Sequence, residues 1–527
     1  MGRHKAWVVA VLAVMTAACT GGGAPKPTPT TTPHRGGRAI FGAEGWPECL
    51  NPINQCSAFP WTWYTVLEHV LPRAMQLDPK GNFVASPLLR EAPSLENGLL
   101  TENPFTITYK ISDRSVWADG SPITSADFDF TWKAILNTTG AYTTVGYTSI
   151  DSIDTTDRKS AVIKFKDVFV DWPDLFGGVY QGILEKAAFP KFASDPNPNL
   201  KHEMDDSIPF SGGPWVLKSW SKEGAVFIRN DRYFGPRSLL DQVTFIPRTD
   251  QEGEINSLLN GQVDAVYAQA SEVSLLKEIR GPGVRALGGP GTSMDALWFS
   301  HDQGPTRDRL VRQALSYSID RQAIADAIIR RNDLSAAVLN CGIRALPGTT
   351  WCQTQPFARF TYDPTKAKAI LESDGYDCSS RPCTRGGKGL VIDYGFRACD
   401  YNRRAETFDI LQEKALAAGI LLRIVIREGT GVFGCLRPAG FPEVEDAALD
   451  FAPDPSVTNI FGCDEIPAKE NSFAGGNRTG WCNPVASQLM EQSDRELDPA
   501  KRLGLLNQVY AMEAEDSVAL PSTWFLS

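Results

Sequence analysis

Cysteine is the residue type whose number and spacing point most directly to a chemistry in this sequence. Ten of the eleven cysteines follow residue 19, and eight of those ten lie between residues 341 and 482. Thiols close together in the chain oxidise to disulfides in an oxidising compartment. A zinc site is the alternative, but the sequence has no Cys-x-x-Cys pair and no histidine beside these cysteines. We predict three local disulfides: Cys49–Cys56, Cys341–Cys352 and Cys378–Cys383. The pairing of four others stays open: Cys399, Cys435, Cys463 and Cys482.

Residue patterns that support catalysis or nucleotide binding are missing. The sequence has no His-Glu-x-x-His, no Gly-x-Ser-x-Gly, no P-loop and no Gly-x-Gly-x-x-Gly segment. With only five histidines, the sequence has few side chains that could form a metal site or an acid–base cluster. We therefore predict a protein that is not an enzyme and that holds no cofactor and no metal. A secreted hydrolase stays as the alternative from another class.

The length and the net charge of the chain indicate how many domains to expect and which partners to exclude. A chain of 527 residues is too long for one ordinary core, so two or more domains are expected. The formal net charge is -10, and no block rich in Lys and Arg follows the N-terminus. Nucleic acid is therefore not predicted as a partner.

The first residues have the order of an export signal. Basic residues at 3–5 precede an apolar run at 6–18, which is shorter than the ~18–20 residues of a membrane-spanning helix. The segment 16–19, TAAC, resembles a bacterial lipoprotein signal in which Cys19 becomes the lipidated first residue. Thr16 stands where such signals usually have Leu or another large aliphatic residue, so the alternative is a Cys19 that is discarded with the signal. Residues 20–35 are rich in Pro, Thr and Gly and predict an extended tether.

Strands and helices alternate along the rest of the chain, which favours an α/β architecture. Period-two alternation predicts a strand at 105–111, and Thr124 with Asp127 fits a capping box that opens a helix. The last helix is predicted to begin at Asp498, as N-cap, followed by Pro499. Further strands are expected at 161–166 and 242–246, and further helices at 252–260, 307–330, 364–373, 404–418 and 484–493.

Six segments, in order, resemble one family, the large extracellular solute-binding proteins of peptide, dipeptide and nickel ABC importers (solute-binding family 5). They are LNP at 50–52, VWADGSPITSADF at 116–128, SGGPW at 211–215, NDRYF at 230–234 with LNGQVD at 259–264, VRQAL to IDR at 311–321, and DFAPDP at 450–455. The resemblance runs from about Gly36 to the C-terminus, with SGGPW in place of the more usual Gly-Thr-Gly-Pro-Tyr.

The resemblance implies a two-lobed, periplasmic-binding-protein-like fold of class II type that closes on its ligand by hinge motion. It divides the chain into a signal peptide, a tether, a discontinuous lobe I with an inserted subdomain, and a disulfide-rich lobe II. The predicted bounds are 1–19 for the signal, 20–35 for the tether, 36–75, 208–292 and 498–527 for lobe I, 76–207 for the subdomain and 293–497 for lobe II.

The resemblance also implies a ligand site between the lobes. A buried zwitterionic peptide needs a carboxylate for its amino group and a cation for its carboxylate, because an unpaired buried charge costs several kcal/mol. Asp450, next to Phe451, matches the acidic position that meets a peptide amino terminus in several relatives, although a turn-capping or solvated Asp is the alternative. Arg397 is the candidate cation, while Arg403 and Arg404 could equally form a solvated face. Aromatic rings that could line the cleft or pack in the core are Trp61, Trp63, Tyr64 and Trp298.

The predicted role is to capture a small ligand, a peptide, and to deliver it to the permease subunits of an ABC importer. An oligosaccharide or a metal chelate is the alternative cargo. The predicted protein is a monomer on the outer face of a bacterial cell membrane, anchored by lipid at Cys19.

Overall fold

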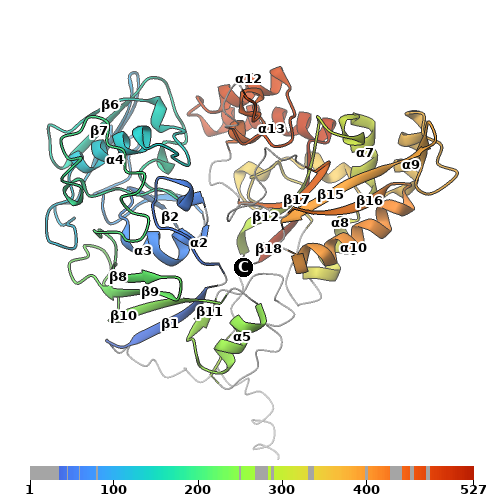
Figure 1. Ribbon diagram of the computed structural model, residues 1–527. Helices are drawn as coiled ribbons and strands as arrows, with labels where there is room; N and C mark the ends of the chain where they lie inside the picture. The colour runs from blue at the N-terminus through green and yellow to red at the C-terminus, as the bar shows by residue number, and fades with distance from the viewer. Residues whose placement is uncertain are drawn as a thin grey trace, which may run out of the picture.

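The chain folds into two lobes, each built around a mixed sheet (Figure 1). The computed structural model describes residues 35–43, 45–58, 60–78, 81–248, 251–266, 283–285, 290–329, 338–397, 401–427, 442–450, 456–469 and 475–526. The predicted signal, Cys19 and nearly all of the tether lie outside these residues. Among the described residues, no helix combines the length and the apolar character needed to cross a bilayer.

A five-stranded sheet forms the base of the first lobe, in the order β11-β1-β10-β9-β8. Strand β1 is parallel to both β10 and β11, whereas β9 runs antiparallel to both β8 and β10. The predicted strand at 242–246 is confirmed as β10. The elements are β1 Arg38–Ala43, β8 Trp215–Ser221, β9 Gly224–Arg229, β10 Gln242–Pro247, α5 Gln251–Leu259 and β11 Ala265–Val266.

A four-stranded antiparallel sheet, β4-β5-β7-β6, packs into the same hydrophobic core. Alternate residues of β5 are buried, as the period-two pattern predicts. The capping box before α4 is confirmed, with the Thr124 amide donating to Asp127 Oδ2 at 2.8 Å. The bounds are β2 Met75–Leu77, β3 Phe83–Ala85, β4 Leu100–Glu102, β5 Phe105–Lys110, α4 Ser125–Asn137, β6 Ile150–Asp154 and β7 Ser160–Phe165.

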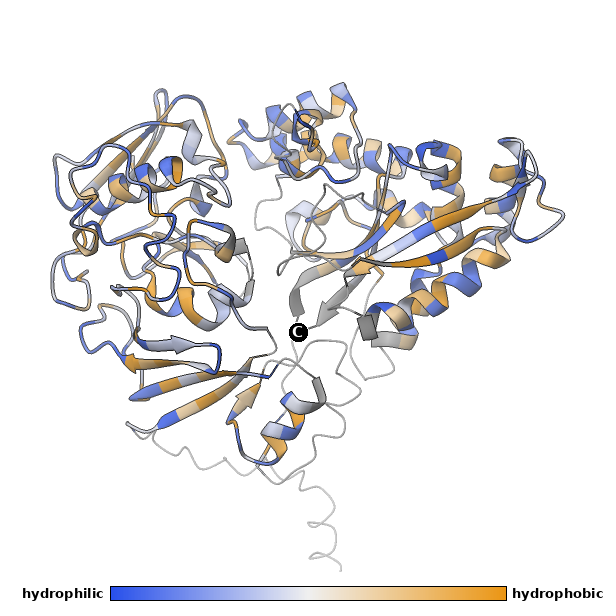
Figure 2. Ribbon diagram, in the orientation of Figure 1, coloured by the Kyte–Doolittle hydropathy of each residue, from blue (hydrophilic) through white to orange (hydrophobic). Residues whose placement is uncertain are grey.

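The second lobe has a five-stranded sheet in the order β16-β15-β17-β12-β18, with a separate core on each face. Leu297 and Phe299 of β12 pack with α10 and α7, whereas Ala296 and Trp298 pack with α12 and α13, because neighbouring strand residues point to opposite faces. Apolar residues are concentrated in these strands (Figure 2). The strands of this sheet are β12 Pro290–Phe299, β15 Val391–Arg397, β16 Leu421–Arg427, β17 Val444–Asp450 and β18 Ala519–Leu526. A separate two-stranded sheet is formed by β13 Thr384–Arg385 and β14 Lys388–Gly389. The helices are α7 Arg309–Ser318, α8 Arg321–Ile324, α9 Pro364–Ser373, α10 Tyr401–Ala417, α11 Thr458–Phe461, α12 Pro484–Ser493 and α13 Pro499–Asp516.

Most predicted helices are found at the predicted positions. Helices α9 and α12 have the predicted bounds, and α13 begins at Pro499, where Asp498 Oδ1 accepts from the Ala500 amide at 2.8 Å. The single helix predicted at 307–330 is instead divided into α7 and α8. The division lies at Asp320, whose side chain accepts from the Ala323 amide at 2.9 Å and so begins a new helix.

Four disulfides join cysteines within the described residues. Three of them are the local pairs singled out from the sequence, and the fourth joins two of the cysteines whose partners were left open, Cys463 and Cys482. Cys399 and Cys435 lie outside the described residues.

The C-terminal segment packs with the second-lobe sheet, whereas the resemblance implied a place for it in lobe I. Strand β18 pairs with β12, with Leu297 opposite Leu520. Helix α13 contributes Leu506, Val509 and Tyr510 to the core that also holds Trp298. Helix α13 ends at Asp516 and β18 begins at Ala519, so the two elements follow one another directly in the chain and lie in the same lobe. The other predicted boundaries stay predictions.

Candidate ligand-binding site

The two charged residues chosen from the sequence lie at one edge of the second-lobe sheet. Strands β15 and β17 are parallel, with Tyr394 opposite Val444, so both end toward the same edge of the sheet; Arg397 lies level with position 447, three residues before Asp450. Strand β12 runs antiparallel to β17 and begins at this edge, where Ser293 is paired with Asp450. The edge is therefore the place where the chain enters the second lobe. The side chains of Arg397 and Asp450, and Phe451 as a whole, lie outside the described residues.

A buried ionic cluster lies just inside this edge. The side chain of Arg404, at the start of α10, is only 1% exposed and its Nη2 lies 2.8 Å from Asp295 Oδ1. Arg404 also forms an ion pair with Asp446, whose Oδ2 accepts a hydrogen bond from the Tyr394 hydroxyl at 2.6 Å. Burial and the neighbouring Asp446 raise the pKa of Tyr394 well above its ordinary value, so this hydroxyl stays a donor. Arg404 is thus a core residue, which excludes a solvated face at this position.

The ion pairs of this cluster hold three elements, α10, β12 and β17, together beside the strand edge. Asp295 is on β12, two residues after Ser293, while Asp446 is on β17, four residues before Asp450. Arg404 therefore joins α10 to both strands that meet at the candidate site. Neither Asp295 nor Asp446 was among the predicted site residues. Asp295 stands between apolar neighbours, and a carboxylate at such a place requires a buried partner, whereas Asp446 follows Glu445 and has no such local signal.

Two aromatic rings of the first lobe remain candidates for contact with a ligand. They belong to one short helical segment made of α2 Pro60–Thr62, a π-helical turn Trp63–Leu67 and α3 Glu68–Val70. Tyr64 is 38% exposed and its hydroxyl oxygen lies 3.1 Å from that of Tyr180. Trp61 is half-buried and meets Tyr64 edge to face, with ring centroids 5.9 Å apart. Both rings are thus held in place while part of their surface stays accessible.

Two other tryptophans are core residues, contrary to the cleft role considered for them. Trp63 is fully buried, and its indole N–H donates to the Ser57 carbonyl at 3.0 Å. Trp298 is 7% exposed and stacks on Phe461 with ring centroids 5.8 Å apart. It also lies at the opposite end of β12 from Ser293, because it pairs with Glu445 near the start of β17.

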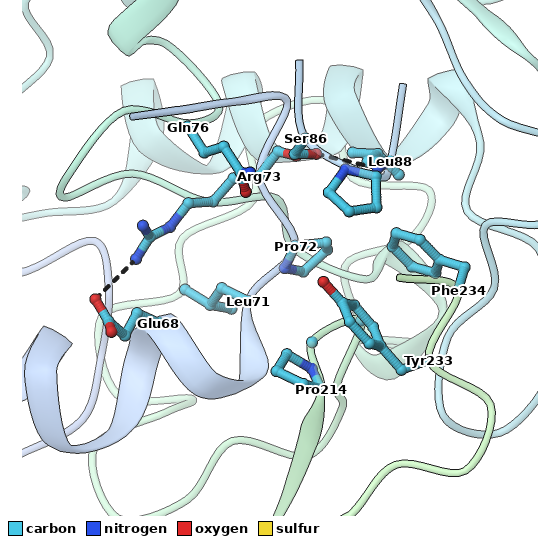
Figure 3. Close-up of a pocket in the computed structure, with 13 residues that line it drawn as sticks. Glu68, Leu71, Pro72, Arg73, Gln76, Ser86, Leu88, Pro214, Tyr233 and Phe234 are labelled. Carbon is cyan, nitrogen blue, oxygen red and sulfur yellow. Dashed lines mark hydrogen bonds and ion pairs between the residues drawn. The ribbon is translucent and has the colours of Figure 1, made fainter. Parts of the chain in front are cut away.

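A small pocket of the first lobe is separate from the strand edge. Figure 3 shows Arg73 reaching from its wall to Glu68, with Nη2 3.6 Å from Oε2. Burial lowers the pKa of Arg73, and Glu68 opposes this effect. The cavity volume is about 90 Å³, and its lining residues all belong to the first lobe. This pocket is therefore not a site between the lobes.

Side chains of the types that ligate metals are spread over the described part of the chain. No group of three or more His, Cys, Asp or Glu side chains gathers there in a way that could hold an ion. The residues at the strand edge are suited to pairing with opposite charges on a ligand.

Comparison with known proteins agrees with this architecture. Residues 95–447 match the family described as "Bacterial extracellular solute-binding proteins, family 5 Middle". The oligopeptide-binding protein OppA of Mycobacterium tuberculosis is 26% identical over 483 residues, which cover 87% of this chain and 75% of that protein. The periplasmic EDTA-binding protein EppA has a TM-score of 0.82 at 18% identity, with 96% of this chain and 93% of that chain covered. The oligopeptide-binding protein AppA from Bacillus subtilis, in complex with a nonapeptide, has a TM-score of 0.74 at 19% identity, with 94% of each chain covered.

Two lobes, each built around a mixed sheet, define the fold of the periplasmic binding proteins. The chain belongs to family 5 of the bacterial extracellular solute-binding proteins. Members of this family are extracytoplasmic binding components of transport systems and are not enzymes.

Proposed function

We propose that this protein captures peptides between its two lobes and delivers them to the permease of an ABC importer. The observation that carries the proposal is the strand edge, where Arg397 and Asp450 end parallel strands beside the entry of β12. An edge that faces the connection between the lobes becomes enclosed when the lobes close. The similarity of the whole chain to oligopeptide-binding proteins supports a peptide as the cargo.

The chemistry of a peptide fits the two charges proposed at this edge. In the enclosed site, Asp450 pairs with the amino group of the peptide and Arg397 pairs with its carboxylate. Each pair offsets the desolvation of the buried charges, and a missing partner costs several kcal/mol. Trp61 and Tyr64 supply flat apolar surface for side chains or peptide planes from the opposite lobe. Main-chain groups and water molecules complete the contacts and tolerate varied side chains.

The proposal includes an anchor and a partner. The signal-like segment that ends at Cys19 supports lipidation there, and residues 20–35, if extended as polyproline II, span about 50 Å at ~3.1 Å per residue. Such a tether keeps a monomeric binding domain at the outer face of the membrane, within reach of the permease subunits. Gel electrophoresis with a labelled fatty acid tests the anchor, because Cys19→Ser should abolish the label.

The experiment that tests the cargo is native mass spectrometry of the mature domain purified from its natural host. Denaturation then releases any co-purified molecule for identification. A released peptide supports the proposal. An oligosaccharide or a metal chelate keeps the transport role and overturns the peptide assignment, while cleavage of an added peptide would support a hydrolase instead.

A further inference from the structure

A second set of charged groups joins the two lobes away from the strand edge. Residues 167–174 follow β7 in the first lobe, and residues 494–502 run from the end of α12 into the first turn of α13 in the second lobe. We call these two segments together the inter-lobe contact. Figure 1 shows α12 and α13 at the top of the view, beside the sheet of β6 and β7, whereas β11, the last strand before the crossing, lies at the bottom. The inter-lobe contact and β11 thus lie at opposite ends of the molecule in this view.

Hydrogen bonds and ion pairs hold the inter-lobe contact together. The Val170 amide donates to the Asp494 carbonyl at 3.1 Å. Arg502 Nη2 lies 3.3 Å from Asp171 Oδ1, and the Arg502 side chain is only 2% exposed. Leu497 of the second lobe packs against the hydrophobic core of the first lobe. The contact therefore combines backbone, ionic and apolar interactions between two otherwise separate cores.

Carboxylates outnumber their cationic partners in the interior of this contact. Asp171 and Asp174 of the first lobe and Asp494 of the second lobe face two guanidinium groups, those of Arg344 and Arg502. The pKa of Asp174 is raised to about 7 by burial and by Asp171, while Arg344 opposes the rise. The pKa of Asp494 is raised to about 6 by burial and by Asp171, against hydrogen bonds from Thr458 and Ser456 and the charge of Arg502. Oδ1 of Asp494 is buried and has no hydrogen-bond partner among the described residues.

Other titratable groups around these carboxylates do not supply the missing positive charge. Tyr109 and Tyr147 face Asp174, and both stay neutral because burial raises their pKa values. Arg495 Nε lies 3.3 Å from Asp167 Oδ2, but both side chains are more than half exposed, so this pair contributes little. The two raised carboxylates thus carry uncompensated negative charge when both are ionised.

We infer that the inter-lobe contact is an acid-strengthened latch, which holds the lobes together when Asp494 is protonated and loosens when it ionises. Separation of the lobes removes Asp171 from the neighbourhood of Asp494 and opens its buried Oδ1 to water, whereas Asp174 keeps its first-lobe neighbours. The closed form therefore binds the Asp494 proton more tightly than the open form. The latch is strongest below the ordinary Asp pKa of 3.8 and weakens as the pH rises through about 6.

Förster resonance energy transfer between two labels on the ligand-free full chain measures the ratio of closed to open molecules directly. Labels attached through a non-natural amino acid at Tyr142 and Val485, which are 49% and 55% exposed and lie in different lobes, leave the native cysteines untouched. The ratio of closed to open molecules should rise about tenfold between pH 8 and pH 5, since such a carboxylate contributes up to tenfold per pH unit below its raised pKa.

Two variants make the test specific. Asp494→Asn imitates the protonated group, so it should stay closed at both pH values. Glu96→Gln, at an exposed position of the first lobe, should keep the wild-type pH response. If Asp494→Asn does not fold, as judged by its circular dichroism, the pH response of the wild type still decides. A wild-type ratio that does not change with pH, or a folded Asp494→Asn with the full response, would overturn the inference.

Discussion

Ser293 of β12 and Asp450 of β17 are paired across the second-lobe sheet, at the edge where the chain arrives from the first lobe. A ligand bound at Asp450 would therefore lie beside the strand that connects the lobes. Such a ligand would contact this strand directly. Its binding therefore favours the arrangement of the lobes in which all contacts between ligand and protein are made.

Arg404 should be essential for stability. Arg404→Met removes the guanidinium that pairs with Asp295 and Asp446 in the core, and breaking a buried ion pair costs about 3–5 kcal/mol. Urea unfolding at pH 7 measures the loss. The matched control is Arg423→Met, because Arg423 is 66% exposed and pairs with Asp393 at the surface, where about 0–1 kcal/mol is expected. Equal losses in the two variants would contradict a structural role for the cluster.

Glu513 should make the protein less stable as the pH rises. It is fully buried on α13, neither carboxylate oxygen has a hydrogen-bond partner among the described residues, and burial raises its pKa well above the ordinary 4.5. The folded protein thus binds this proton more tightly than the unfolded chain. The stability that depends on it is complete below pH 4.5 and falls by up to ~1.4 kcal/mol per pH unit toward the raised pKa.

Glu513→Gln should flatten this dependence, since the amide stays neutral at every pH. Unfolding free energies at pH 5, 7 and 8 provide the comparison. Glu491→Gln, at an exposed position of α12, should keep the wild-type slope. A Glu513→Gln slope equal to that of the wild type would show that this carboxyl group is not the origin of the effect.

Helix α13 was predicted from an N-cap Asp498 followed by Pro499, and the structure shows the same order of N-cap and proline at the start of α9 and α12, a signal local to each element. The place of β18 and α13 could not be predicted in this way. Strand β18 pairs with β12, and α13 packs in the core that holds Trp298 of β12, about two hundred residues earlier in the chain; no local pattern encodes such a partner.

The candidate site was predicted only in part, for a similar reason. Asp450 and Arg397 could be placed through resemblance, and the strand register brings them to one edge. The core positions of Trp63 and Trp298 were not predictable, because a tryptophan next to a charged or polar residue has the same local pattern in a cleft and in a core. The burial of Arg404 depends on carboxylates from two other strands.

The disulfides should contribute to stability according to the length of chain that they close. Cys463 and Cys482 are 19 residues apart, whereas Cys378 and Cys383 are 5 apart. The loop-entropy relation gives about 3 kcal/mol for the longer loop and about 2 kcal/mol for the shorter one. Chemical unfolding of the two double-serine variants, each against the wild type, measures both values. A greater loss for the pair at 378 and 383 would contradict the prediction.

Gly45→Ala should weaken ligand binding by displacing Trp61. A Cβ at this position would lie 2.1 Å from Trp61 Cδ1, so the ring must move. Loss of one aromatic contact should reduce the affinity for the co-purified ligand by about 1 kcal/mol, as measured by calorimetric titration. Gly504→Ala, where a Cβ meets nothing within 4 Å, is the control and should bind normally. Unchanged binding by Gly45→Ala would remove Trp61 from the site.

The most direct test of the central claim is a calorimetric titration of the released peptide, with a free and with an acetylated amino terminus, into the wild type and Asp450→Asn. Acetylation removes the charge that Asp450 is proposed to pair with. It should cost the wild type about 2–5 kcal/mol of binding free energy and should cost Asp450→Asn almost nothing. Asp464→Asn, at an exposed position of the same lobe, should behave as the wild type. Equal binding of the two peptides by the wild type, or undiminished discrimination by Asp450→Asn, would contradict peptide capture through Asp450.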